Sequence, residues 1–208
     1  MDKQKIWNEK ISQAGTVVDG LGLELDEDIK ECVVGFWVNG FSTAGSCGGH
    51  IGEKYRPLLF PYVYIEPLNR PDNRYVGEKE LKEEMVKKYS LKDYRDIYDN
   101  KEIWKEYEDR AGKLEESPEW IKWYDACLKK RGSVESLLDE YKNYNNGSKI
   151  ITEETFPGYR IEYDFDEEKL KDVDLSKNYK MFESDLLKAK DEFKKLTEFL
   201  KKRYFWGM

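Results

Sequence analysis

One short stretch of this chain alternates apolar and charged residues. Over Tyr159–Phe165 the sequence reads Tyr-Arg-Ile-Glu-Tyr-Asp-Phe. Because successive side chains of a β-strand point to opposite faces, this pattern predicts a strand in a sheet with one buried and one wet face. A second strand is predicted over Tyr62–Glu66, which two prolines bracket, and shorter strands over Phe41–Ala44 and Lys149–Thr152. The chain is therefore expected to contain a small, mainly antiparallel sheet.

Most of the remaining sequence has the spacing of amphipathic helices, with apolar residues at i, i+3, i+4 and i+7. The predicted helices cover about Asp28–Asn39, Glu78–Tyr89, Leu91–Arg110, a segment starting at Ser117, a segment from Ser133 to Asn146, and Ser176–Tyr204. We therefore expect an α+β fold in which helices pack on one face of the sheet. We also expect a single domain, residues 1–208, with a helical insertion or layer at about 78–146 and a long C-terminal helix at about 176–204.

Composition narrows the class of protein. Aromatic residues make up 14% of the chain and hydrophobic residues 39%, which is enough for a core and argues against disorder. The longest apolar stretches, such as Cys32–Trp37, are shorter than the ~18–20 residues of a membrane span. The three cysteines form no disulfide framework, and the N-terminal sequence has no signal-peptide pattern. We therefore expect a cytoplasmic protein.

Charge limits the partners of the chain. The net charge of -7 at pH 7 argues against broad adhesion to nucleic acid or to anionic membranes. Between Leu186 and Arg203, however, seven basic residues accompany three acidic ones. This local excess predicts either a solvated helix face or a surface that binds polyanions. The same helix repeats apolar residues in steps of three and four from Tyr179 to Leu200, which predicts packing along the domain or self-association as a coiled coil.

The run Ser46–His50, Ser-Cys-Gly-Gly-His, carries most of the chemistry that the sequence offers. It contains the only histidine of the chain and places a hydroxyl, a thiol and an imidazole within five residues. Its two glycines allow a tight turn with exposed backbone N–H groups. Because the run lies between two predicted strands and follows a predicted buried helix, a rigid scaffold would hold it in place.

Four interpretations of this run are open. The glycines could form a plain connection, with Cys47 buried and His50 hydrogen-bonded. The N–H groups could instead bind a phosphate or carboxylate, with Ser46, His50 and Arg56 adding donors and charge. Cys47 could be a nucleophile with His50 as its base. Cys47 and His50 also have the spacing of metal ligands. No second Cys/His pair completes a tetrahedral set, so carboxylates would have to supply the other ligands, and we assign no metal ligands from the sequence.

The segment Thr43–His50 also resembles sequences of known families. Its pattern Thr-x-x-Ser-Cys-x-Gly-His is similar to a motif of small uncharacterised bacterial and phage proteins. Over about Asp26–Glu66 the chain is distantly similar to the tRNA-wybutosine-synthesising methyltransferase family, in which a capped helix and a Thr-containing strand lead into a Ser-Cys-Ser-Gly-Arg-Ile run. The resemblance implies a methyl-transfer or nucleotide-handling site here, with S-adenosylmethionine as the cofactor.

These observations lead to three hypotheses for function. The first is a ligand-binding or catalytic site for a phosphate-bearing small molecule or a nucleotide. The second, implied by the resemblance alone, is a methyltransferase-like activity on RNA. The third is a non-enzymatic interaction module that uses the Tyr- and Trp-rich helices or the C-terminal helix. Cys47 and His50 are the predicted catalytic residues. The predicted ligand-binding residues are Thr43, Ser46, Gly48, Gly49 and Arg56.

Overall fold

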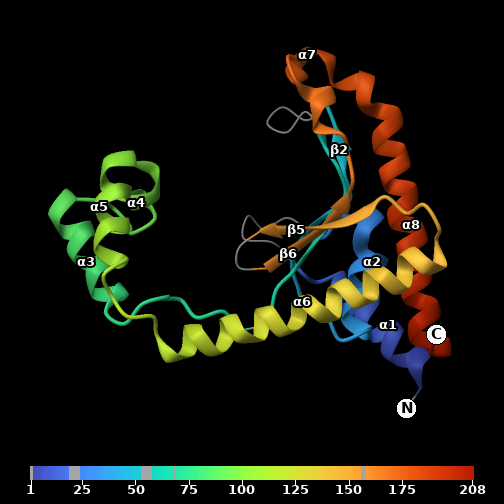
Figure 1. The fold of residues 1–208 in the computed structure, drawn as a ribbon, viewed down its shortest axis with the longest axis horizontal. Helices are drawn as coiled ribbons and strands as arrows, with labels where there is room; N and C mark the ends of the chain where they lie inside the picture. The colour runs from blue at the N-terminus through green and yellow to red at the C-terminus, as the bar shows by residue number, and fades with distance from the viewer. Residues whose placement is uncertain (1, 19–23, 53–57, 68, 156–157) are drawn as a thin grey trace. The chain divides into compact units, whose positions relative to one another are not determined.

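The computed structural model describes residues 2–18, 24–52, 58–67, 69–155 and 158–208. Contacts divide the chain into two compact units: Met1–Leu68 with Lys129–Met208 form the first, and Asn69–Leu128 forms the second. Helices and a small antiparallel sheet, drawn in Figure 1, confirm the predicted α+β class.

The first unit is built around a four-stranded sheet with the strand order β1-β4-β6-β5. The strands are β1 Thr43–Cys47, β4 Tyr62–Ile65, β6 Gly158–Tyr163 and β5 Ile150–Thr155, and each neighbouring pair is antiparallel. A two-stranded sheet pairs β2, His50–Ile51, with β3, Leu58–Leu59. The central strands β4 and β6 overlap the predicted strands Tyr62–Glu66 and Tyr159–Phe165, although β6 ends two residues earlier than predicted.

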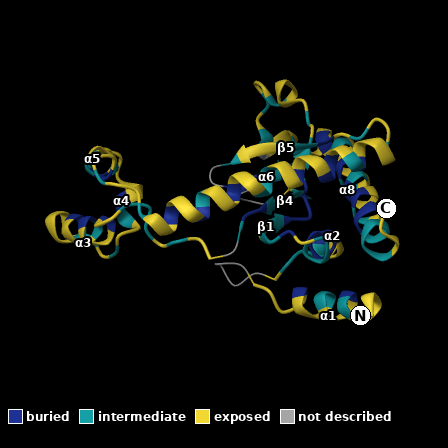
Figure 2. Ribbon diagram, turned by 60° about the horizontal axis from the view of Figure 1, so that its bottom comes forward, coloured by how far each residue is buried: buried dark blue, intermediate teal, exposed yellow. Residues whose placement is uncertain are grey.

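Three helices pack on one face of the four-stranded sheet. They are α2 Glu27–Val38, the part of α6 (Pro118–Tyr144) from residue 129 onward, and α8 Glu183–Trp206. Val63 of β4 and Ile161 of β6 contribute to a core that Phe36 of α2 and Leu196 of α8 also enter. Figure 2 shows buried residues on β4, α2, α6 and α8. A further helix, α1 Lys3–Ala14, packs against α2.

α6 corrects one prediction. The sequence predicts separate helices that start near Ser117 and Ser133, whereas α6 is continuous. Its buried residues Cys127 and Val134 lie seven positions apart, so the apolar stripe continues through Gly132. One glycine costs a helix about 1 kcal/mol relative to alanine, which is too little to end it.

The predicted helix Leu91–Arg110 is divided into two. α4 covers Asp96–Asp99 and α5 covers Lys101–Ala111. Asn100 separates them, because its side chain accepts hydrogen bonds from the N–H groups of the second and third residues of α5. This is the geometry of an N-cap, and it starts a new helix in place of the predicted continuous one.

The predicted C-terminal helix Ser176–Tyr204 also begins later than expected. A 3₁₀ turn, Glu167–Leu170, a short helix α7, Leu175–Asn178, and a second 3₁₀ turn, Tyr179–Phe182, precede α8. The apolar seam is buried from its second member onward, at Phe182, Leu186, Ala189, Phe193, Leu196 and Leu200. The seam therefore packs along the domain.

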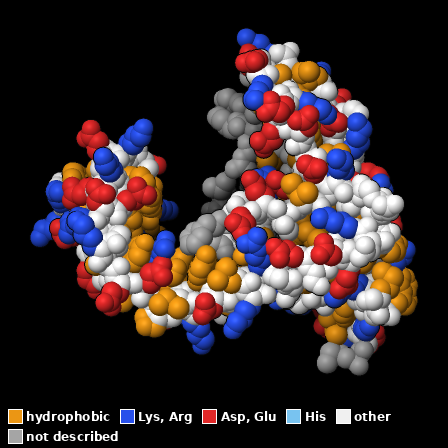
Figure 3. Space-filling model, viewed as in Figure 1, with side chains coloured by type: hydrophobic (Ala, Val, Ile, Leu, Met, Phe, Trp, Pro, Cys, Tyr) orange, Lys and Arg blue, Asp and Glu red, His pale blue; other side chains and the backbone are white. Residues whose placement is uncertain are grey.

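The cations of α8 are largely matched by carboxylates of the same chain. Ion pairs are formed by Lys188, Lys190, Lys195, Lys201 and Arg203. Figure 3 shows basic and acidic side chains interspersed over the helices rather than gathered by sign. Such pairing is typical of a solvated helix face, and polyanion binding by this face stays a prediction. Within the described residues, no helix has both the length and the apolar composition needed to cross a membrane.

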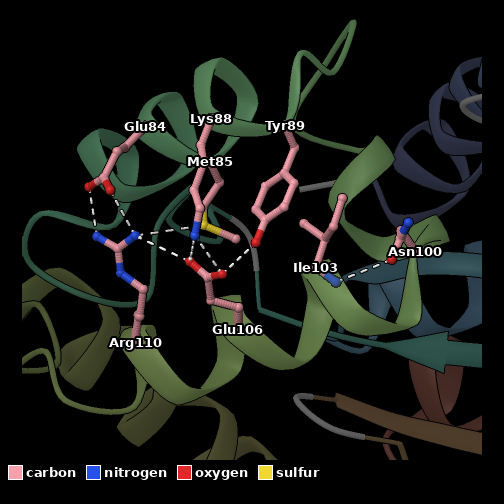
Figure 4. Close-up of polar contacts among 8 residues, drawn as sticks. All are labelled: Glu84, Met85, Lys88, Tyr89, Asn100, Ile103, Glu106 and Arg110. Atoms are coloured by element: carbon pink, nitrogen blue, oxygen red, sulfur yellow. Dashed lines mark hydrogen bonds and ion pairs between the residues drawn. The ribbon is translucent and has the colours of Figure 1, made fainter.

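The second unit has its own core between α3, Glu78–Tyr89, α4 and α5. An ionic network joins α3 to α5 on its surface. The Arg110 guanidinium contacts the Glu84 carboxylate through two N–O distances of 2.8 and 2.6 Å. Figure 4 shows that Glu106 also faces Arg110 and accepts hydrogen bonds from Lys88 and Tyr89.

Glu78 is a buried carboxylate at the start of α3, with 5% of its surface exposed. It accepts hydrogen bonds from the Tyr75 N–H at 2.9 Å, the Tyr107 hydroxyl at 2.6 Å and the Lys82 ammonium at 2.6 Å, and also from the Arg74 N–H. Burial alone would raise the pKa of Glu78, but the hydrogen bonds from Lys82, Tyr107 and Tyr75 outweigh it and lower the pKa. The second unit is therefore stabilised by the charged form of Glu78.

Two helix-interior glycines provide a matched test of the packing in the first unit. A Cβ atom at Gly35 would lie 2.9 Å from Leu200 Cβ, whereas a Cβ atom at Gly132 would meet nothing within 4 Å. We predict that Gly35→Ala lowers the free energy of unfolding by about 1–3 kcal/mol, because α2 and α8 must move apart. Gly132→Ala should raise it by about 0.5–1 kcal/mol through helix propensity alone. Urea denaturation measures both, and a stabilising effect of Gly35→Ala would contradict the close packing of α2 on α8.

A second prediction concerns acid. Because the folded-state pKa of Glu78 lies below its ordinary value of 4.5, its charge contributes stability fully above that pH and loses it as the pH falls through the folded-state pKa. Glu78→Gln should lower the stability of the second unit by about 1.5–3 kcal/mol and remove this part of the acid dependence. Hydrogen exchange in peptides from residues 69–128 measures the effect, with peptides from residues 183–206 as an internal reference. Equal exchange in wild type and variant would contradict the prediction.

Candidate functional site

The run singled out by the sequence is a turn between two strands. β1 ends at Cys47 and β2 begins at His50, so only Gly48 and Gly49 lie between them. This corrects the prediction that the strand ends at Ala44. β1 continues because Ser46 and Cys47 pair with Val63 and Tyr62 of β4. The thiol and the imidazole therefore project from strand ends and not from a long loop.

Gly48 and Gly49 both lie so close to neighbouring elements that neither position has room for a side chain. A Cβ atom at Gly48 would lie 3.1 Å from the Cβ atoms of both Asp26 and Asp28, at the start of α2. Gly49 has a φ of 81°, and its Cβ would lie 2.8 Å from Pro61 Cδ and 2.9 Å from Leu186 Cδ1. Any larger residue would push the turn away from α2 and α8.

α2 and β1 lie side by side and are tied together at both ends. The Trp37 indole N–H donates to Thr43 Oγ1 at 2.8 Å, and the Gly48 N–H donates to Asp26 Oδ2 at 2.7 Å. Trp37 lies eleven residue steps after Asp26 along the helix, and Gly48 lies five residue steps after Thr43 along the strand. Both spans are about 17 Å, from a rise of 1.5 Å per helical and 3.3 Å per strand residue. The match in length places Asp26 at the turn.

Asp26 occupies the N-cap position of α2, but its side chain does not cap the helix. An aspartate at this position ordinarily caps its helix. The Asp26 carboxylate instead points to the neighbouring turn, where it accepts the Gly48 N–H. Asp28 is paired with Lys190 at 2.8 Å. The one sequence signal for Asp26 is thus an N-cap pattern, which does not disclose a role at the site.

Cys47 and His50 contact each other across the turn. The distance from Cys47 Sγ to His50 Nε2 is 3.3 Å, and the Gly49 N–H donates to Cys47 Sγ, also at 3.3 Å. Cys47 is 4% exposed, whereas His50 is half-buried. One ligand atom each from Asp26, Cys47 and His50 lies within 4.8 Å of the other two. The structure therefore brings both predicted catalytic residues together and adds Asp26, which sequence reasoning missed.

The predicted ligand-binding residues are distributed differently. Gly48 and Gly49 form the turn, and Ser46 lies next to it in β1. Thr43 is at the opposite end of β1, four residues from Cys47 and about 13 Å away along the strand, where it accepts the bond from Trp37. Arg56 lies outside the described residues.

The backbone groups of the turn are engaged with protein acceptors. The predicted anion cradle needs N–H groups that point to a ligand, but the Gly48 N–H donates to Asp26 and the Gly49 N–H to Cys47. An anion here would displace both acceptors and would meet the Asp26 carboxylate. The Gly48 and Gly49 N–H groups therefore do not form the predicted open cradle for an anion in this structure.

The other two cysteines are in different surroundings. Cys32 lies in the core under α8, and Cys127 is buried beside Trp120 and Trp123. Burial raises the pKa of the Cys32 thiol to about 12, and a hydrogen bond with Thr197 offsets only part of this rise. Cys32 is thus an unreactive thiol, and it serves as an internal reference for Cys47.

Comparison of the chain with protein-family models, with curated proteins and with solved structures found no match. The resemblance to the methyltransferase family therefore stays a prediction.

We predict that Gly49→Ala is more destabilising than Gly147→Ala. Both glycines have positive φ, 81° and 87°, but a Cβ atom at Gly147 would meet nothing within 4 Å. Each substitution forces a strained backbone, which costs about 1–3 kcal/mol, and only Gly49→Ala adds the clashes with Pro61 and Leu186. Thermal unfolding measures the difference. Equal losses in the two variants would show that the turn does not pack against α8 as described.

Proposed function

We propose that this protein is a thiol-dependent enzyme in which Cys47 is the nucleophile and His50 is the general base. The observation that carries the proposal is the 3.3 Å distance between Cys47 Sγ and His50 Nε2. A nucleophile and a base within hydrogen-bond reach are the central requirement of covalent thiol catalysis. His50 is the only histidine of the chain, so a single imidazole serves this role.

The proposed reaction proceeds by proton transfer and attack. The Cys47 thiol proton moves to His50 Nε2, and the thiolate attacks an electrophilic carbon of the substrate, such as a carbonyl carbon. An S–C bond forms, and the leaving group departs with the proton returned by His50. In hydrolysis, His50 then takes a proton from water as the water oxygen attacks the same carbon, and it returns that proton to the Cys47 sulfur as the S–C bond breaks.

Two neighbouring groups support this pair. The Gly49 N–H donates to Cys47 Sγ, and a hydrogen bond to sulfur stabilises the negative charge of a thiolate. The Asp26 carboxylate lies within 4.8 Å of the reacting atoms, and its negative charge favours the imidazolium that proton transfer creates. Its hydrogen bond to Gly48 also holds the turn in place.

Alkylation of each cysteine at neutral pH tests the proposal. In the native chain, iodoacetamide should label Cys47 and leave Cys32 and Cys127 unlabelled, as peptide mass spectrometry can measure. His50→Gln should slow the labelling of Cys47 by about 10-fold or more, because the thiol loses its proton acceptor. Incubation with p-nitrophenyl acetate should place an acetyl group on Cys47 of the wild type.

His50→Asn is a second variant that lacks the imidazole. Circular dichroism of both His50 variants shows whether they are folded. If Cys47 of a folded His50 variant reacts as fast as that of the wild type, His50 is not its base. If Cys47 is as unreactive as Cys32 in the wild type, the proposed function is wrong.

A further inference from the structure

The three side chains at the turn offer the donors that a transition metal prefers. Cys47 supplies sulfur, His50 supplies nitrogen and Asp26 supplies oxygen, from two segments that lie more than twenty residues apart. We propose that Asp26, Cys47 and His50 bind a divalent transition-metal ion of the Zn²⁺ class, and that the bound ion blocks the thiol of Cys47. Binding is independent of the proposed function, whereas the blocking effect rests on it.

The distances suit a single ion. Zinc binds sulfur at ~2.3 Å and nitrogen or oxygen at ~2.0–2.2 Å, so two ligand atoms on one tetrahedral ion lie about 3.3–3.8 Å apart. The Sγ–Nε2 distance of 3.3 Å is a few tenths of an ångström shorter than the ~3.5–3.6 Å of a sulfur–nitrogen pair on such an ion. All three ligand atoms lie within 4.8 Å of one another, so a movement of about 1 Å brings them to bonding positions.

Backbone groups hold two of the three ligands. The Gly49 N–H donates to Cys47 Sγ and the Gly48 N–H donates to Asp26 Oδ2. Such outer hydrogen bonds orient the ligands of metal sites and are worth about 10–100-fold in affinity. The same two glycines allow the turn to approach α2, so the sequence feature that makes the turn tight also positions the metal ligands.

Charge and donor type narrow the choice of ion. The Cys47 thiolate and the Asp26 carboxylate together neutralise a divalent cation, and the neutral imidazole adds a third bond. Thiolate and imidazole donors select Zn²⁺ and similar ions, whereas Mg²⁺ and Ca²⁺ prefer oxygen ligands only. The Asp26 carboxylate, which accepts the Gly48 N–H, would attract a cation at this point and would repel an anion.

The blocking effect follows from the atoms involved. A bound ion uses lone pairs of Cys47 Sγ and His50 Nε2, which are the nucleophile and the base of the proposed reaction. The thiol can then neither pass its proton to His50 nor attack a substrate. Zn²⁺ would therefore act as a reversible inhibitor of the same site.

Titration of the metal-free, full-length chain with Co²⁺ and then Zn²⁺ tests the binding. We expect one equivalent of Co²⁺ to produce a thiolate-to-cobalt charge-transfer band that Zn²⁺ removes. Cys47→Ala should abolish the band, and Asp26→Ala should weaken Zn²⁺ binding by about 10-fold or more. Asp26→Asn keeps an acceptor for the Gly48 N–H but lacks the charge, so it separates metal binding from folding.

Glu27→Ala is the matched control, because Glu27 is an exposed carboxylate at the same helix end and pairs with Lys30. It should bind Zn²⁺ as the wild type does. Absence of one-equivalent binding, or binding that Cys47→Ala and folded Asp26 variants leave unchanged, would overturn the inference.

The two proposals can fail separately. If Cys47 is alkylated in a His50-dependent way and no metal binds, the inference is wrong and the proposed function stands. If metal binds through the three residues but metal-free Cys47 does not react, the binding stands and the proposed function is wrong. If bound Zn²⁺ leaves the alkylation rate of Cys47 unchanged, the blocking effect is wrong.

Discussion

Two hydrogen bonds between α2 and β1 position the side chains of the candidate site relative to one another. One hydrogen bond, from Trp37 to Thr43, joins the end of the helix to the start of the strand, and another, from Gly48 to Asp26, joins the start of the helix to the end of the strand. Because the two spans are equally long, the Asp26 carboxylate reaches the turn that presents Cys47 and His50. A shift of one helical turn in α2 would remove Asp26 from the site.

The core keeps α2 in this register. α8 approaches α2 so closely that a Cβ atom at Gly35 would contact Leu200, and Leu186 of α8 packs against the Gly49 position. α8, whose apolar seam is buried, thus contacts both α2 and the turn. This explains how a turn of two glycines can hold a thiol and an imidazole at a fixed distance, as both the proposed catalysis and the proposed metal binding require.

Periodicity was sufficient to predict the elements that bury one face. β4, β6, α2 and α3 each show their buried side in the spacing of apolar residues, and the α+β class follows from them. Features that depend on a partner elsewhere in the chain could not be predicted. β1 extends to Cys47 because β4 pairs with it, and α6 continues through Gly132 because its buried stripe does.

The part of the site that is local in sequence was predictable, and the part that depends on another element was not. Cys47 and His50 are close in sequence, and a turn between two strands brings them together. Asp26 comes from another element, and only the packing of α2 on β1 places it there. The turn N–H groups looked free in the sequence, but in the structure they donate to Asp26 and Cys47, which favours the proposed cation over the predicted anion.

The nuclear magnetic resonance spectrum of the imidazole tests the central claim most directly, namely that Asp26, Cys47 and His50 form one site. Because the chain has a single histidine, the ¹H–¹⁵N ring signals of His50 need no assignment. We expect Asp26→Asn and Cys47→Ala each to change the ring ¹⁵N shifts, and Glu27→Gln to leave them unchanged. Ring signals that neither of the first two variants alters would contradict the convergence of the three side chains.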